Sequence, residues 1–340
     1  MPAPIPVSIC IPARNEAASL PALLAALAAL DTAGADPVAV IYLDDCSDGS
    51  ERLLHATAHD FPFRLVIGTG TGGGEANAGR ARRAAMAAGL GHAGQDGLLL
   101  TTDADSRPRG DWLQATVRAL AHADVAAGRI VRAGGAGDAL QGRIEAYYDA
   151  LHGYRRTIDP VPWDGGGHHF SGGANLAFRA AAYRAIDGFR PIPSGEDATA
   201  LDDAARAGLR VRRDAAMVVE TSSRRHGRAP GGLAAALRGI DAGDVPHVLH
   251  PLSAAWQYRA HALARASFAA LASPPACEAL GQALGLTADH VLGVGRDCPN
   301  AEAFAMRIVP VAPHCRGLVP LPEAEAALAA LCDTRCEQAA

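Results

Sequence analysis

The stretch Leu98-Leu99-Leu100-Thr101-Thr102-Asp103-Ala104-Asp105-Ser106 carries the strongest fold signal in the chain. A short apolar run that ends in polar turn residues is typical of a buried β-strand. Two carboxylates at positions i and i+2 beyond such a strand can face one small volume, where they repel each other unless a cation lies between them. Mg²⁺ and Mn²⁺ prefer oxygen ligands, and a substrate diphosphate can complete their coordination. The stretch predicts a strand leading into a divalent-metal site, and a solvated turn is the alternative explanation.

The rest of the first half alternates strand-like runs with Ala-, Leu- and Arg-rich helical patterns. The other strand-like runs are Val7–Ile11, Val38–Leu43, Arg64–Ile67 and Val125–Val131, and the helical patterns cover 17–30, 51–59, 75–90 and 111–121. This alternation predicts an α/β fold, a mainly parallel Rossmann-like sheet with helices on both faces. Ligands bind such sheets beyond the carboxyl ends of the strands. Asn15 is the expected N-cap of the first helix, and Ser47 or Asp48 that of the second.

The second half is less regular. The pattern predicts a helix over 140–154, a Gly- and Pro-rich loop over 160–173, strands over 175–178 and 211–220, and a helix that begins at Glu196. Beyond Gly239 the pattern is helical and poor in strands. We therefore expect a domain over residues 1–240 and a C-terminal helical region over 241–340. Acceptor binding, formation of a homodimer and capping of the core are all open as roles for that region.

Composition excludes several classes of protein. The net charge is −5 and the sequence pI is about 6.2, which argues against a nucleic-acid-binding protein. All 31 basic residues are arginine, so Schiff-base and P-loop lysines are excluded. Seven cysteines form no CxxC pair, as expected of reduced thiols in a cytoplasmic protein. We expect neither a signal peptide nor a transmembrane segment.

Polar clusters follow two further predicted strands. They are Pro12-Ala13-Arg14-Asn15-Glu16 after the first strand and Asp44-Asp45-Cys46-Ser47-Asp48-Gly49-Ser50 after the second. Together with Asp103 and Asp105, the glycine loop Gly172–Asn175 and the pair Glu196-Asp197, they occur in an order and spacing that resembles the family 2 glycosyltransferases of the GT-A fold. The resemblance covers about residues 5 to 232. The set is specific, although each piece alone is weak.

The resemblance implies a nucleotide-diphosphate sugar donor, with UDP or GDP as the nucleotide. The residues that it places around the donor are Pro12, Ala13, Arg14, Glu16, Asp44, Asp45, Asn77, Arg80, Asp103, Ala104 and Gly173. Arg80 or Arg83 is expected near phosphate, whereas Arg82 is interpreted as part of a solvated helix face. Asp103 and Asp105 are the expected Mg²⁺ or Mn²⁺ ligands, with Asp105 the more direct of the two.

The resemblance also implies an acceptor side. Asp197, next to Glu196, is the expected general base that takes the proton of an acceptor hydroxyl in an inverting transfer, although acids also favour a helix N-terminus for its dipole alone. In the loop Ser222–Arg228, the three arginines are expected to neutralise phosphate charge, with Arg225 and Arg228 as the donor-binding residues. His226 is expected to be a third metal ligand. His168 and His169 are either acceptor contacts or plain loop residues. The chain lacks the QxxRW signature of the polymer-making members.

Other functions remain open at this stage. Gly68–Gly73 matches GxGxxG, which would suggest a dinucleotide-binding oxidoreductase, but it follows the third strand instead of the first. A sugar-phosphate nucleotidyltransferase would share the architecture but place a glycine-rich loop after its first strand. A non-catalytic sugar- or nucleotide-binding protein is a further alternative, and so is a retaining transferase acting on glycerate-type acceptors.

Overall fold

A computed structural model describes residues 3–70, 76–132, 139–225, 227 and 232–339 of the chain. Its centre is an eight-stranded sheet with the order β3-β2-β1-β4-β7-β6-β8-β5. The strands are β1 (Ile5–Ala13), β2 (Ala35–Asp44), β3 (Arg64–Gly70), β4 (Leu98–Thr101), β5 (Ser106–Pro108), β6 (Val125–Arg132), β7 (Leu176–Arg179) and β8 (Val211–Thr221). Strands β3, β2, β1 and β4 pair in parallel, as do β6 and β8, while β7 and β5 pair antiparallel to their neighbours. The predicted mainly parallel sheet is confirmed.

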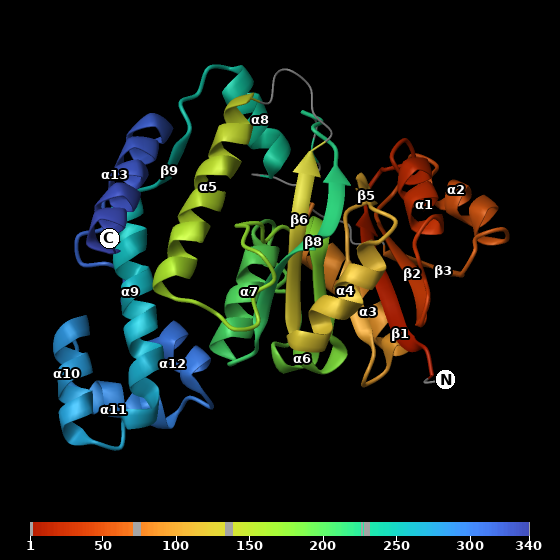
Figure 1. The fold of residues 1–340 in the computed structure, drawn as a ribbon. Coiled ribbons are helices and arrows are strands. Elements are labelled where there is room, and N and C mark those ends of the chain that lie inside the picture. The colour runs from red at the N-terminus through yellow and green to blue at the C-terminus, as the bar shows by residue number, and fades with distance from the viewer. Residues whose placement is uncertain (1–2, 71–75, 133–138, 226, 228–231, 340) are drawn as a thin grey trace.

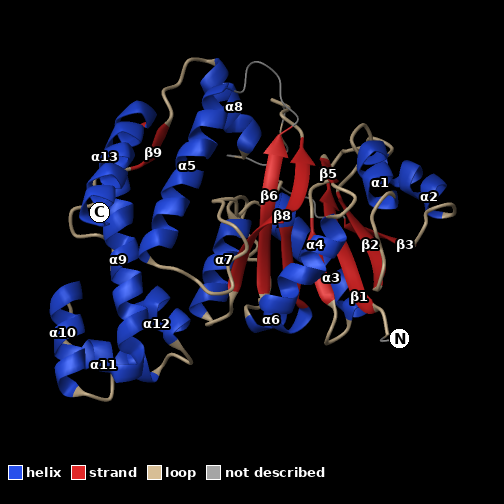
Figure 2. Cartoon of the chain, viewed as in Figure 1, coloured by secondary structure: helices blue, strands red, loops and turns tan. Residues whose placement is uncertain are grey.

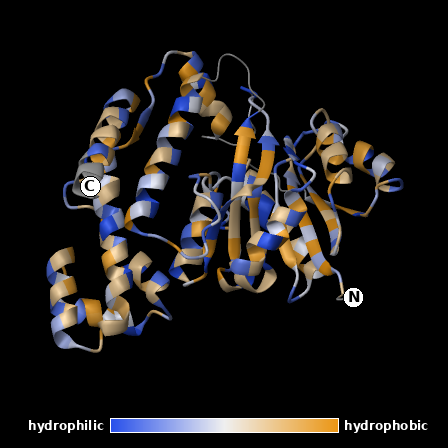
Figure 3. Cartoon of the chain, in the orientation of Figure 1, coloured by the Kyte–Doolittle hydropathy of each residue, from blue (hydrophilic) through white to orange (hydrophobic). Residues whose placement is uncertain are grey.

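Helices cover both faces of this sheet, as predicted (Figures 1 and 2). Leu and Trp side chains of α1 (Leu20–Ala28), α2 (Ser50–Ala58) and α4 (Trp112–His122) are buried with the sheet on one face. Side chains of α3 (Ala78–Ala93), α6 (Ala180–Ala185) and α7 (Glu196–Arg206) are buried on the other. Apolar residues dominate the central strands (Figure 3) because they are covered on both sides.

The C-terminal helices pack beside the sheet domain. They are α8 (Leu233–Asp241), α9 (Pro251–Ser267), α10 (Pro274–Leu284), α11 (Ala288–Arg296), α12 (Ala301–Ile308) and α13 (Leu321–Ala339), with a two-stranded sheet of β9 (His247–Leu249) and β10 (Leu318–Pro320). Helices α9 to α12 share one apolar core. The long helix α5 (Ala139–Ile158) buries Tyr147, Leu151 and Tyr154 against α9, α13 and β9. The boundary at residue 240 stays a prediction.

Both predicted N-caps are wrong. Helix α1 begins at Leu20 after Ser19, and Asn15 instead has a left-handed backbone (φ 53°) and accepts a hydrogen bond from the Ser47 amide with its side chain. Helix α2 follows Gly49, whose φ is 87°. The polar side chains link the two loops to each other because the loops lie side by side at the sheet edge. No helix in the described residues is both long and apolar enough to cross a bilayer.

Candidate functional site

A cavity of about 470 Å³ opens where β1, β2 and β4 end. Most of the site residues expected from sequence line it: Pro12, Ala13, Arg14, Glu16, Asp44, Asn77, Asp103, Ala104, Asp105, Gly173, Glu196 and Asp197. The strands β1, β2 and β4 are parallel neighbours, so their carboxyl ends meet at one edge. Parallel pairing therefore brings together segments that are far apart in the sequence.

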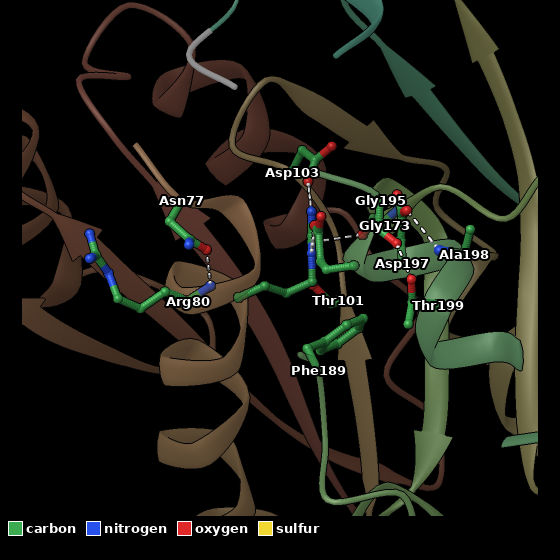
Figure 4. A network of polar contacts seen from close by, with 12 residues as sticks. Asn77, Arg80, Thr101, Asp103, Gly173, Phe189, Gly195, Asp197, Ala198 and Thr199 are labelled. Atoms are coloured by element: carbon green, nitrogen blue, oxygen red, sulfur yellow. Dashed lines mark hydrogen bonds and ion pairs between the residues drawn. The ribbon is translucent and has the colours of Figure 1, made fainter. Parts of the chain in front are cut away.

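The loops after β1 and β2 are held together by arginine–carboxylate pairs. Arg14 donates to Asp44 at 3.1 Å and to Asp45 at 3.3 Å. Asp44 is buried, and Arg80 lies 3.8 Å from its second oxygen. Asp45 and Arg80 stand at the margin and do not line the cavity themselves. Asn77 caps α3 by accepting from the Arg80 amide (Figure 4). Its amide nitrogen donates to the Pro191 carbonyl.

Asp103 and Asp105 lie in the turn between β4 and β5. Each carboxylate pairs with a different arginine. Asp103 accepts a hydrogen bond from Arg82 at 2.8 Å, and Asp105 lies 3.2 Å from Arg224. Burial, with Asp103 nearby, raises the pKa of Asp105 to about 6, against the opposing effect of Arg224. The two carboxylates thus crowd one volume, as their spacing predicts. Among the described residues, no three His, Cys, Asp or Glu side chains come together as a metal site.

Arg82 is the largest correction to the sequence analysis. It is not on a solvated helix face, since only 5% of the residue is exposed. Its guanidinium contacts Asp103, Glu196 at 3.1 Å, and both the Thr101 hydroxyl and the Gly173 carbonyl at 2.9 Å. Figure 4 labels three of these partners, Thr101, Asp103 and Gly173. Burial opposes its charge, but Asp103 and Glu196 outweigh burial and raise the pKa of Arg82. Arg82 therefore connects Asp103 after β4 with the acidic start of α7.

Its neighbour Arg83 points elsewhere. Arg83 donates to the carbonyl of Phe189 at 3.0 Å and pairs with the exposed Asp187. It does not line the cavity. Of two adjacent arginines, the one interpreted as solvated is buried in the site, and the other binds a surface loop.

Glu196 and Asp197 open α7 at the cavity wall. Glu196 is buried, and burial raises its pKa although Arg82 opposes the shift. The Asp197 carboxylate accepts from the Gly173 amide at 2.8 Å with one oxygen and from the Ala198 amide at 2.7 Å with the other (Figure 4). Two backbone amides therefore fix the orientation of the Asp197 carboxylate beside the glycine loop.

Arg224 is one of the three arginines of the loop Ser222–Arg228 that the sequence places near phosphate. It forms a two-nitrogen ion pair with the buried Glu16, including a 2.6 Å hydrogen bond, and it lines the cavity. The expected Arg225 instead pairs with Asp241 of α8 at 2.8 Å and does not line the cavity. His226 and Arg228 lie outside the described residues. The sequence does not indicate which of the three neighbouring arginines faces the cavity.

The remaining sequence candidates do not line the cavity. Gly68 and Gly70 lie inside β3 instead of at a turn into a helix, and residues 71–73 of that GxGxxG match fall outside the described residues. A Cβ on Gly70 would lie 1.8 Å from the Tyr42 hydroxyl, so the packing of Tyr42 explains why this position holds glycine. His169 contacts Asp149 at 2.7 Å, and His168 is fully buried.

Comparisons with known proteins agree with this architecture. The model of the family described as Glycosyl transferase family 2 matches residues 8–186. S. aureus TarS 1-349 in complex with UDP-GlcNAc is similar at 15% identity and a TM-score of 0.51, covering 88% of this chain and 90% of that chain. A longer S. aureus TarS structure has a TM-score of 0.50 at 15% identity, over 89% of this chain and 55% of that one. The TarS similarity shows a shared fold.

One further solved structure is the Pyrobaculum calidifontis mannosyltransferase PcManGT in complex with GDP-Man and Mn²⁺. It is similar at 19% identity and a TM-score of 0.49, over 99% of this chain and 81% of that chain. No curated protein matches the sequence.

Proposed function

The chain belongs to glycosyltransferase family 2, and on that premise we propose that it moves a sugar from a nucleotide-diphosphate donor to a hydroxyl acceptor. The observation that carries the proposal is the convergence of Asp44, Asp103, Asp105 and Asp197 on one cavity at the carboxyl edge of the sheet. The UDP-GlcNAc bound by TarS, which shares this fold, supports a nucleotide-sugar donor.

We assign the donor nucleotide to the loops after β1 and β2. The paired Arg14 and Asp44 present a carboxylate able to accept from a base N–H, and Pro12 and Ala13 are small enough to let the ring approach. Arg80 stands at the margin beside Asp44, where a guanidinium is suited to phosphate. The transferred sugar would then lie toward Gly173.

The carboxylates after β4 fit a divalent cation. Mg²⁺ and Mn²⁺ are held in proteins by one or two carboxylates together with substrate phosphates, and Asp105 and Asp103 supply two such groups. Burial and like charge already disfavour ionisation of Asp105, which a bound cation would relieve. What the cation supplies is stabilisation of charge on the departing diphosphate. Arg224, which contacts Asp105, is placed to contact the same diphosphate.

Asp197 is our proposed general base. It lines the cavity beside Gly173, and two amide donors hold its carboxylate in one orientation. A base fixed in this way takes the proton of an acceptor hydroxyl as its oxygen attacks the anomeric carbon. Such an attack opposite the leaving group inverts the configuration of the sugar. Glu196 is bound to Arg82 and serves to position this end of α7.

Calorimetric titration tests the donor and the metal together. Purified protein is titrated with UDP, GDP and their sugar conjugates, with and without Mn²⁺, as the wild type, Asp105→Asn and the control Asp111→Asn. Asp111 is exposed and makes no side-chain cap bond to α4. We expect one nucleotide to bind at least about tenfold more tightly with Mn²⁺, a loss of this gain in Asp105→Asn, and no change in Asp111→Asn. Failure of every nucleotide to bind would refute the proposed site.

A further inference from the structure

Arg224 is shared between two carboxylates in the cavity at the ends of β1, β2 and β4, which we call the donor cavity. Its two terminal nitrogens bind the two oxygens of Glu16, one of them at 2.6 Å. Its Nε lies 3.2 Å from Oδ2 of Asp105. The Glu16 side chain is 6% exposed and the Asp105 side chain 16%, so both ion pairs are largely shielded from water. One guanidinium therefore serves the loop after β1 and the turn after β4.

The two ion pairs of Arg224 differ in strength. Glu16 meets Arg224 through two nitrogens, the geometry that makes arginine–carboxylate pairs strong, whereas Asp105 meets a single nitrogen. Glu16 is also held in place, because its carboxylate accepts a hydrogen bond from the Ser19 hydroxyl at 2.8 Å and its backbone amide donates to the Ser50 hydroxyl. We expect Arg224 to stay bound to Glu16 when its contact with Asp105 is broken.

Asp105 and Arg224 line two cavities at once. One is the donor cavity, and the other is a cavity of about 390 Å³. The remaining lining residues of the second cavity are Ser19, Ala22, Leu23, Arg107, Ser222 and Ser223. This space allows the Arg224 guanidinium to turn away from Asp105 without displacing a packed side chain. Asp105 would then be open to another cation from the donor cavity.

We propose that Arg224 competes with the divalent cation for Asp105, and that the diphosphate of the donor removes this competition. The inference rests on the proposed function, which supplies both the cation and the diphosphate. A guanidinium binds phosphate oxygens in the same two-nitrogen geometry as carboxylate oxygens, so a diphosphate offers Arg224 a replacement for Asp105. The freed Asp105 carboxylate then accepts the cation. Arg224 thus makes tight binding of the cation depend on the presence of the nucleotide.

Titration with Mn²⁺ alone, followed by the electron paramagnetic resonance signal of the free ion, tests the competition. The proteins are the wild type, Arg224→Met and the control Arg107→Met. Arg107 lines the second cavity, but its side chain is 48% exposed and its partner Glu220 lies 3.8 Å away. We expect Arg224→Met to bind Mn²⁺ at least about fivefold more tightly than the wild type. The control removes an equal charge close by and should change the affinity by less than about twofold, because exposed charges are screened.

Calorimetry with UDP or GDP tests the role of the diphosphate. The factor by which Mn²⁺ tightens nucleotide binding equals the factor by which the nucleotide tightens Mn²⁺ binding. In Arg224→Met this factor should be at least about fivefold smaller than in the wild type, because the diphosphate has no competitor left to remove. The loss of a positive charge alone would instead tighten Mn²⁺ binding equally with and without nucleotide, and would leave the factor unchanged.

A double variant separates Asp105 from Glu16 as the source of the effect. Arg224→Met leaves the buried Glu16 carboxylate without its cation, which destabilises the fold and offers Mn²⁺ a second carboxylate. Glu16→Gln combined with Arg224→Met removes both charges, and it should show the same gain in Mn²⁺ affinity. A gain that is absent from the double variant would trace the effect to Glu16 and overturn the inference.

The outcomes distinguish this inference from the proposed function. Nucleotide binding that depends on Mn²⁺, with Mn²⁺ affinity or coupling in Arg224→Met equal to that of the wild type, would overturn the inference alone. An equal gain of affinity in Arg107→Met would overturn it as well, since the effect would then come from charge and not from contact with Asp105. A wild type that binds no nucleotide would overturn the proposed function and the inference together.

Discussion

Replacement of Arg82 by methionine should strongly destabilise the protein. The guanidinium donates to the Thr101 hydroxyl and the Gly173 carbonyl at 2.9 Å, and to the carboxylates of Asp103 at 2.8 Å and Glu196 at 3.1 Å. Methionine retains much of the apolar stem but none of these donors. The Glu196 side chain, 4% exposed, would then be a buried carboxylate without its cation.

The magnitude follows from the loss of one partner of a buried ion pair, which costs about 3–5 kcal/mol. Burial already raises the pKa of Glu196 while Arg82 opposes that shift, so the variant should raise it further. A carboxyl whose folded-state pKa lies above its unfolded value favours folding at low pH and loses that contribution as pH rises through the folded pKa. The penalty in Arg82→Met should therefore grow as pH rises above about 4.5, the unfolded pKa.

Urea unfolding at pH 5 and pH 7, followed by circular dichroism, measures this effect. The control Arg118→Met removes an exposed arginine of α4 and should change the free energy of unfolding by less than about 0.5 kcal/mol. Adding Glu196→Gln to Arg82→Met should recover about 2 kcal/mol, because the buried charge is removed with its partner. A loss below about 1 kcal/mol in the single variant, or no recovery in the double variant, would refute the reasoning.

Three other predictions concern catalysis, pH and core polarity. Asp197→Asn should lower the rate of nucleotide release from the donor by about 10²–10⁴-fold. The donor affinity, measured by calorimetry, should not change. A loss of rate below about tenfold would argue against a general base. Burial lowers the pKa of His168 to about 4 from 6.5, so its neutral form contributes stability above pH 6.5 that is lost as pH falls toward 4. At about 1.4 kcal/mol per pKa unit, the loss of stability reaches roughly 3 kcal/mol. The unfolding midpoint of His168→Leu should therefore depend less on pH over that range than the midpoint of the wild type. An equal pH dependence in the two proteins would contradict the assignment. Asn175→Ala should cost about 2–5 kcal/mol in urea unfolding, because it leaves the Trp112 indole N–H and the Arg129 and Met217 carbonyls without partners; a cost under about 1 kcal/mol would contradict this.

Much of the sheet was predictable because its signals are local. The apolar runs at β1, β2 and β4 and the polar clusters that follow them identify strands and the edge where they end. Strand β5, only Ser106–Pro108, was not predicted because three polar and turn-forming residues carry no strand signal. It exists because Ser106 and Pro108 pair with Thr221 and Val219 of β8.

The sequence by itself determined the alternation of strands and helices, the family, and the acidic clusters at one sheet edge. These follow from side-chain periodicity and from spacing along a few residues. Only the tertiary structure decided which arginine pairs with which carboxylate. Arg82 and Glu196 are 114 positions apart, and Arg224 and Glu16 are 208 apart. Such pairs depend on how helices and loops dock on the sheet, and no local pattern distinguishes Arg82 from Arg83 or Arg224 from Arg225 before that docking occurs.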